Sequence, residues 1–228
     1  MSDPAPCVSD AVATRRSVRG FSNAPVDGGL IRRILSKAAR APSGGNLQPW
    51  HVFVLANEPL DELKAIMRDR TRELPQGEPT EYDVYPPELW SPYRERRFQV
   101  GEDMYELIGI PREDKEARRR WFARNFQFFD APVALFCYVD RGMGPPQWSD
   151  LGMYLQTVML LLREEGLHSC AQECWSLYPD TIGRFLNVPD ALMLFCGMAV
   201  GYADPAQPAN RLDSRRAPLE EFARFHGL

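Results

Sequence analysis

We predict an α+β fold for this chain: one domain, residues 1–228, with a central sheet of short strands surrounded by helices. Three observations predict it. Helical periodicity recurs along most of the chain, whereas only about four apolar segments have the length of a strand. Apolar residues make up 44% of the 228 residues, enough to bury a substantial core. No internal repeat and no linker divides the chain.

The charge balance and the first residues narrow the functional class. The formal net charge is −4, whereas a general nucleic-acid binder usually has a strong basic excess. No apolar run approaches the ~20 residues that a membrane-spanning helix needs. The chain starts M-S-D-P-A-P-C-V-S-D, with an acid and prolines where a signal peptide has a basic region and an apolar core. We therefore expect a cytoplasmic protein that binds neither nucleic acid nor membrane.

The five cysteines are scattered, and without an export signal we expect reduced thiols. In an extended segment, His168, Cys170 and Cys174 would share one face as candidate zinc ligands. No second cluster completes a tetrahedral site, and free cysteines are often simply buried. We predict no metal site.

Helix and strand signals alternate through the first third of the chain. Asp10–Thr14 has the length of one or two helical turns. Asp27 can cap a helix that runs to about Arg40 with apolar residues on one face. The run His51–Ala56 is short, apolar and partly β-branched, which predicts a buried strand. A further helix is predicted over Pro59–Arg72.

An excursion over residues 74–111 has a different composition. Five prolines and four aromatic residues lie between Leu74 and Tyr93, and the prolines exclude regular helix or strand there. A helix is predicted to follow over Arg94–Ile108. Aromatic residues in an irregular segment usually pack on something: the body, a partner subunit or a planar substrate. A packing role and a role as a lid both remain open.

The second half continues the alternation. The predicted helices are Arg112–Phe129, Ser149–Glu165 and Pro179–Leu186, and the predicted strands are Ala131–Val139, His168–Glu173 and Leu192–Gly201. The helix Ser149–Glu165 is apolar nearly all round and ends at Gly166, so we expect it at the domain centre or in a subunit interface. In the tail, Leu219, Phe222 and Phe225 are spaced as in a helix and need a surface to dock on, such as a second subunit.

The loop that follows the first long helix has the composition of a ligand-binding loop. Residues 38–50 read A-A-R-A-P-S-G-G-N-L-Q-P-W. Glycines allow close approach of the backbone, and the Ser, Asn and Gln side chains supply donors and acceptors. These groups suit a flat, hydrogen-bonding heterocycle better than a metal. An ordinary helix-to-strand turn is the alternative.

Residues 15–21, R-R-S-V-R-G-F, concentrate anion-binding donors. Three arginines and a serine lie within five positions, and guanidinium groups match phosphate oxygens at any working pH. The alternative is a solvated basic patch, although Val18 and Phe21 indicate a segment that is packed down.

Together with G-M-A-V-G-Y-A-D-P before an arginine-bearing tail, these two motifs resemble the FMN-dependent nitroreductase family, in order and from Arg15 onward. The resemblance implies an α+β homodimer with FMN at the subunit interface. It further implies that hydride from NADH or NADPH reaches the flavin, and that electrons then pass to nitroaromatic or quinone-type acceptors in a ping-pong cycle.

The resemblance also implies residue roles. The flavin phosphate and ribityl chain are assigned to Arg15, Arg16, Ser17, Arg19 and Arg216, the loop from the other subunit to Pro42, Ser43, Gly44, Asn46 and Gln48, and the main chain near the reactive nitrogen to Gln172 and Glu173. Arg215 is one position from the arginine assigned to the phosphate. Many relatives have proline where this chain has Ala171 and a small residue where it has Cys174.

No catalytic side chain is expected, because the flavin carries the hydride and the protein supplies orientation and electrostatics. The three histidines, His51, His168 and His226, lie in unrelated contexts. No G-x-G-x-x-G motif opens a βαβ unit, so we expect the nicotinamide to stack transiently on the flavin.

Two other functions use the same scaffold. One is a reductive dehalogenase of halophenols or a flavin-modifying enzyme. A lid for a halotyrosine needs an acid, a tyrosine and a lysine together; Glu81, Tyr82 and Tyr85 are present, but no lysine is near. The other is a non-enzymatic flavin-binding or sensor module.

Overall fold

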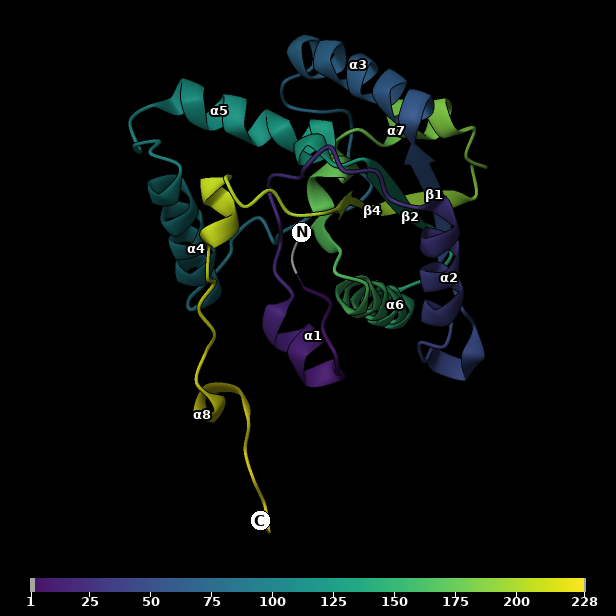
Figure 1. Ribbon diagram of the computed structural model, residues 1–228, viewed down its shortest axis with the longest axis vertical. Coiled ribbons are helices and arrows are strands. Elements are labelled where there is room, and N and C mark those ends of the chain that lie inside the picture. The colour runs from purple at the N-terminus through teal and green to yellow at the C-terminus, as the bar shows by residue number, and fades with distance from the viewer. Residues whose placement is uncertain (1–2, 228) are drawn as a thin grey trace.

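The computed structural model describes residues 3–227. Its centre is a four-stranded antiparallel sheet in the order β1-β2-β4-β3 (Figure 1). The strands are β1 (His51–Ala56), β2 (Val133–Asp140), β3 (His168–Gln172) and β4 (Leu192–Gly201). The predicted α+β class is confirmed, and so are the positions of the four predicted strands, with ends shifted by two residues at most. The burial predicted for His51–Ala56 is wrong, because β1 lies at the edge of the sheet and only its Leu55 is buried.

Both faces of the sheet are buried, as β2 shows most clearly. Successive side chains of a strand point to opposite faces. Phe136 and Tyr138 belong to the core on one face, whereas Leu135 and Cys137 belong to the core on the other. The unbroken apolar run of β2 is therefore the consequence of a sheet that is covered on both sides.

Helices cover the two faces in pairs. On one face lie α3 (Asn57–Glu73) and α7 (Pro179–Leu186), and on the other lie α2 (Gly28–Ala38) and α6 (Pro145–Glu164) (Figure 1). The short helix α1 (Val8–Thr14) packs on α6. The sheet is thus the middle layer of three.

The predicted helix ends are confirmed where capping chemistry is local. The carboxylate of Asp27 accepts two backbone N–H bonds of 3.0 Å from the first turn of α2. After α6, Gly166 adopts φ = +73°, and the N–H of Leu167 donates to the carbonyl of Leu162 at 2.8 Å. Glycine reaches this left-handed conformation without steric cost.

The helix predicted over Arg112–Phe129 is wrong. Helix α5 covers only Lys115–Ala123, and a 3₁₀ segment, η2 (Arg124–Asp130), follows. Phe128 and Phe129 both have φ = +51° and are fully buried. The backbone leaves the helical path because both rings enter the core, and Phe128 stacks on Trp175 with 4.4 Å between ring centroids.

The start predicted for the long helix is also wrong, since α6 begins at Pro145 and not at Ser149. Two prolines occupy its first turn, where the fixed φ of proline suits a helix and the missing N–H has no partner to lose. Tyr154 and Val158 are buried, whereas Met153 is 38% exposed. One side of α6 is therefore left uncovered within the chain.

The excursion is irregular at first and helical later. Residues 74–92 form neither helix nor strand, as the prolines predict. Helix α4 (Tyr93–Leu107) follows and contains no buried residue. It lies with α5 at one side of the molecule, beyond the edge of the sheet (Figure 1).

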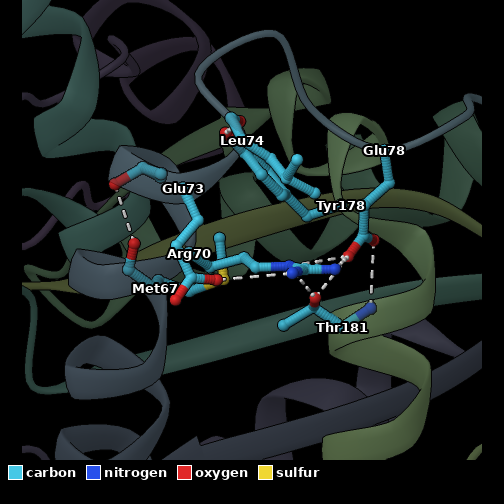
Figure 2. A network of polar contacts seen from close by, with 8 residues as sticks. Met67, Arg70, Glu73, Leu74, Glu78, Tyr178 and Thr181 are labelled. Carbon is cyan, nitrogen blue, oxygen red and sulfur yellow. Dashed lines mark hydrogen bonds and ion pairs between the residues drawn. The ribbon is translucent and has the colours of Figure 1, made fainter.

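A polar network fixes the beginning of the excursion (Figure 2). The buried carboxylate of Glu78 accepts from Arg70 Nη2 at 2.9 Å and from the backbone N–H of Thr181 at 3.0 Å. The Tyr178 hydroxyl donates to the carbonyl of Leu74 at 2.8 Å. Burial alone raises the pKa of Glu78, but hydrogen bonds from Thr181 and Arg70 hold that pKa below its ordinary value. The network ties the segment to α7.

The chain stays packed on the body of the molecule through η4 (Pro208–Arg211), where Ala209 is buried, and leaves it afterwards (Figure 1). The departing segment contains α8 (Leu219–Phe222), which ends before Phe225. Phe222 is 71% exposed and Phe225 is 61% exposed. Within residues 3–227, no helix combines the length and apolarity needed to cross a membrane.

Candidate functional site

A cavity of about 690 Å³ lies between the end of β3 and helix α4. One wall comes from the segment after β3 and from Arg19, and the other comes from the excursion. The lining residues are Arg19, Val84, Tyr85, Arg97, Val100, Gly101, Met104, Tyr105, Phe122, Asn125, Ala171, Gln172, Glu173, Cys174, Leu177 and Leu212. The first wall therefore combines the end of β3 with Arg19, one arginine of the R-R-S-V-R motif.

The arginine motif continues the sheet beyond β3. Ser17 forms a parallel bridge with Ser169, and the N–H of Val18 donates to the carbonyl of Ser169 at 3.0 Å. Because an extended segment alternates its side chains, Arg15, Ser17 and Arg19 point to the same side. That is the side on which Arg19 lines the cavity.

Arg16 lies on the opposite side of this segment. It lines a second cavity, of about 500 Å³, together with Val18 and His168. Its Nη1 donates to the carbonyl of Asn210 at 3.2 Å. The structure therefore brings Arg15 and Arg19, but not Arg16, to the cavity side of the segment; the flavin contact assigned to Arg16 stays a prediction.

Arg15, on the cavity side of the segment, and Arg216 lack an acidic partner among the described residues. Burial and the neighbouring charge of Arg216 lower the pKa of Arg15. Within residues 3–227, neither Arg15 nor Arg216 forms an ion pair, whereas Arg215 Nε lies 3.8 Å from the carboxylate of Asp103. Two neighbouring guanidinium groups without a carboxylate are what a bound anion would neutralise. This arrangement favours Arg216 over Arg215 as the phosphate ligand.

The segment after β3 offers main chain rather than reactive side chains. The Gln172 side chain is occupied: its Nε2 donates to the carbonyl of Asn125 at 2.8 Å, and its Oε1 accepts from Trp175 Nε1 at 3.3 Å. Burial raises the pKa of Cys170 and Cys174, so both thiols stay protonated. Desolvation also raises the pKa of Glu173. Among the described residues beside the cavity, neither cysteine is a thiolate nucleophile.

The polar loop of residues 42–48 is well defined but lies elsewhere. Asn46 and Gln48 adopt φ of +59° and +50°, and the Gln48 N–H donates to Ser43 Oγ at 3.0 Å. The N–H of Gly44 donates to the carboxylate of Asp150 on α6 at 3.2 Å. The loop carries η1 (Gly44–Asn46), is largely exposed, and contributes no residue to the cavity.

Within one chain, the two predicted halves of the site are thus apart. Sequence reasoning also missed Asp150, the buried acid that holds the loop. The sequence feature that could have revealed it is an acidic residue within the otherwise apolar helix α6. A buried carboxylate without a partner destabilises the fold, so such a residue indicates a hydrogen-bond partner.

The excursion supplies the other wall of the cavity. The sequence predicts a lid or a packing element there but does not say which residues face the site. Tyr85 and Arg97 do. Glu81 and Tyr82, considered for a halotyrosine lid, are engaged elsewhere: Glu81 pairs with Arg141, and the Tyr82 hydroxyl donates to the carbonyl of Phe195.

In the part of the chain that the structure describes, no group of three or more His, Cys, Asp or Glu side chains could hold a metal ion. The cavity is lined by the cations Arg19 and Arg97, by apolar and aromatic side chains, and by the segment after β3, whose Cys174 thiol is protonated. Such a lining suits a planar, anionic organic group.

The chain matches the family model "Nitroreductase family" over residues 12–202, and it belongs to that family. It is 36% identical to the nitrobenzene nitroreductase of Ectopseudomonas oleovorans, over 96% of this chain and 97% of the relative. It is 37% identical to the 4-nitrobenzoate reductase of Pseudomonas putida, over 95% of this chain and 94% of the relative.

The same fold occurs in solved structures. The crystal structure of the FMN and NADPH-dependent nitroreductase NfnB from Sphigopyxis sp. strain HMH superposes with a TM-score of 0.94 at 46% identity, covering 97% of this chain and 100% of that chain. NfnB from Mycobacterium smegmatis, described as FMN-dependent and solved with NADPH, superposes with a TM-score of 0.91 at 28% identity, covering 96% of this chain and 97% of that chain.

Proposed function

We propose that this chain is an FMN-dependent oxidoreductase that reduces nitroaromatic compounds with NADPH or NADH. The observation that carries the proposal is the pair Arg15 and Arg216, two neighbouring cations without a carboxylate, with Arg15 on the same side of the motif as Arg19 of the cavity wall. Relatives named for nitroaromatic reduction align with nearly the whole chain, and an FMN and NADPH-dependent enzyme superposes on it.

The residues present fit FMN. Arg15 and Arg216 hold the phosphate, and Ser17 and Arg19 follow on the same side of the extended segment toward the end of β3. The main chain at Gln172 and Glu173 lies at the cavity wall, where it can contact the ring. We keep Arg16 as a predicted contact of the same cofactor.

Bound FMN supplies hydride acceptance from a nicotinamide and electron transfer to a nitro group. The chain orients the reactants and shields them: aromatic and apolar side chains of the excursion line the cavity, and protonated Cys170 and Cys174 add no competing nucleophile. In the same proposal, residues 1–228 form one domain with the excursion at 74–111 as its lid.

We also propose that the protein is a homodimer, in which the loop containing Pro42, Ser43, Gly44, Asn46 and Gln48 completes the partner's site. Exposed apolar side chains on the surface of one chain support this. Val8 and Val12 of α1, Leu47 of the loop and Phe222 of the tail are each more than half exposed. Sedimentation equilibrium tests the proposal, and a mass of 26.0 kDa, that of one chain, would contradict it.

A cytoplasmic location completes the proposal, since the reaction requires a supply of reduced nicotinamide cofactor. Cell fractionation with antibody detection checks it, and recovery outside the cytoplasmic fraction would contradict it. The halophenol dehalogenase alternative gains no support from Glu81 and Tyr82, because of its three lid residues Tyr85 alone lines the cavity.

The first test is spectroscopic. The purified protein loaded with FMN is expected to be yellow, to bleach anaerobically on addition of NADPH or NADH, and to regain its colour on addition of nitrobenzene or 4-nitrobenzoate. Colourless protein that fails to take up FMN would end the proposal, and FMN that no nicotinamide reduces would favour a sensor module.

The phosphate assignment is tested by Arg15→Ala and Arg216→Ala. Each is expected to weaken FMN binding by ~1–3 kcal/mol, the range of a hydrogen bond to a charged group. Equilibrium dialysis of FMN measures the change. Arg32→Ala, which removes an exposed arginine of α2, is the matched control and is expected to leave FMN binding unchanged.

A further inference from the structure

The cavity carries a charge pattern that bears on the substrate. Relatives named for uncharged nitrobenzenes and for 4-nitrobenzoate resemble this chain equally, at 36% and 37% identity. Overall similarity therefore does not choose between neutral and anionic nitroaromatics. The choice has to come from the residues that line the cavity, and the inference below rests on the proposed function.

The cavity wall is net positive. Among the described residues that line it, Arg19 and Arg97 are the cations and Glu173 is the acid. Arg19 belongs to the motif assigned to the cofactor, and its Nη1 donates to the carbonyl of Ser17 at 3.3 Å. The other cation, Arg97, belongs to the wall that the excursion forms.

Arg97 differs from its neighbours on α4. Arg94 pairs with Glu95, and Arg96 pairs with Glu221 of the tail. Within residues 3–227, Arg97 has no ion pair and no hydrogen bond from its side chain. Its guanidinium carbon instead lies 4.2 Å from the centroid of the Tyr85 ring. A stacked guanidinium keeps its N–H donors available for another acceptor.

The rest of this wall suits an aromatic ring. Val100 and Met104 follow Arg97 along α4, and Tyr105 and Phe122 add aromatic faces. The other wall is the segment Ala171–Cys174. An aromatic ring between the walls would direct one substituent to Arg97 and the opposite one to the end of β3.

We propose that Arg97 binds the carboxylate of an aromatic nitro acid and thereby selects nitrobenzoates over uncharged nitroaromatics of the same size. A guanidinium can donate two parallel N–H bonds to a carboxylate, which adds both geometry and affinity. The Tyr85 ring holds the guanidinium at the wall by a cation–π contact. Arg97 is a specificity residue and takes no part in the electron transfer.

The experiment compares the FMN-loaded protein and its Arg97→Met and Arg97→Lys variants on 4-nitrobenzoate and 4-nitrobenzamide, a neutral substrate of similar size. The ratio of kcat/KM for the acid to that for the amide is expected to fall about 10- to 100-fold in Arg97→Met, mainly through KM of the acid. Arg97→Lys keeps the charge and is expected to retain part of the ratio. Arg94→Met is the matched control on α4, outside the cavity.

Two further readouts separate charge recognition from a merely structural role. Titration of the oxidised holoenzyme with 4-nitrobenzoate, followed by flavin absorbance, gives Kd without turnover, and Arg97→Met is expected to raise it by the same factor. Added NaCl is expected to weaken acid binding in the wild-type protein and much less in Arg97→Met, because salt screens an exposed ion pair.

An unchanged ratio and an unchanged Kd in Arg97→Met overturn the inference and leave the proposed function standing if both compounds are reduced. If neither compound is reduced although FMN is bound, the proposed function fails. The Kd of 4-nitrobenzoate then still decides whether Arg97 recognises the carboxylate.

Discussion

Strand β2 and helix α4 are held in place by different forces. Every residue from Val133 to Val139 is buried, and helices cover both sides of the strand. Helix α4 buries none of its residues and is held by ion pairs, the exposed pair of Arg96 with Glu221 and the part-buried pair of Glu102 with Arg118, and by contacts of Arg side chains with rings. Exposed ion pairs contribute ~0–1 kcal/mol each, whereas burying one large apolar side chain contributes ~2–3 kcal/mol.

The comparison teaches where this protein can change. Substitutions in the sheet are expected to cost stability, because the interior is close-packed. Substitutions on the outer wall of the cavity are expected to alter ligand recognition at little cost in stability. The cavity lies on the boundary between the two regions, with a rigid wall from β3 and a wall from the excursion that the core does not hold.

The largest effect is expected for Gly197→Ala in β4. An added Cβ would lie 2.3 Å from Cδ1 of Trp175. Trp175 is fully buried, with Phe128 and Phe136 packed against its ring, so it has no room to move. Overpacking of this kind is expected to cost about 3 kcal/mol of the free energy of unfolding, measured by urea denaturation.

Phe98→Ala on α4 is the matched counterpart. Phe98 is 48% exposed, and its truncation is expected to change the free energy of unfolding by less than about 0.5 kcal/mol. A cost close to that of Gly197→Ala would break the comparison and would mean that α4 is buried in the assembled protein.

A smaller effect than that of Gly197→Ala is expected for Glu78→Gln, at the junction of the two regions. Loss of the charged hydrogen bonds to Arg70 and Thr181 is expected to cost about 2 kcal/mol at pH 7 and to speed hydrogen exchange in residues 74–92. Mass-spectrometric hydrogen exchange measures the second effect. Glu88→Gln, an exposed acid of the same segment, is the control.

The sign of the pH dependence follows from the depressed pKa of Glu78. Its contribution to stability is full above the ordinary carboxyl value of 4.5 and is lost as the pH falls below it, because the unfolded chain takes up the proton first. Glu78→Gln is therefore expected to flatten the loss of stability below pH 4.5. If the free energy of unfolding of the variant falls as steeply below pH 4.5 as that of the wild-type protein, Glu78 does not cause the loss of stability in acid.

The features that sequence reasoning predicted correctly are those with a local cause. Asp27 caps α2 with its own first turn, and Gly166 ends α6 through its own φ. Strands β1 and β4 show as apolar runs with matching ends, although only Leu55 of β1 is buried. The prediction of a helix through Phe129 was wrong. Phe128 and Phe129 bury both rings in the core with a backbone of positive φ, and helical periodicity in the sequence does not reveal that conformation.

By itself, the sequence determined the α+β class, the family and the set of cationic and polar segments, because periodicity, capping and motif chemistry act over a few neighbouring residues. Only the tertiary structure decided that Arg15 and Arg19 face one way and Arg16 the other, that the loop at residues 42–48 lies apart from them, and that Arg97 faces the cavity. Those facts depend on which strand pairs with which and on how helices pack across the sheet. Such long-range contacts arise from burial shared by the whole chain and leave no signal at a single position.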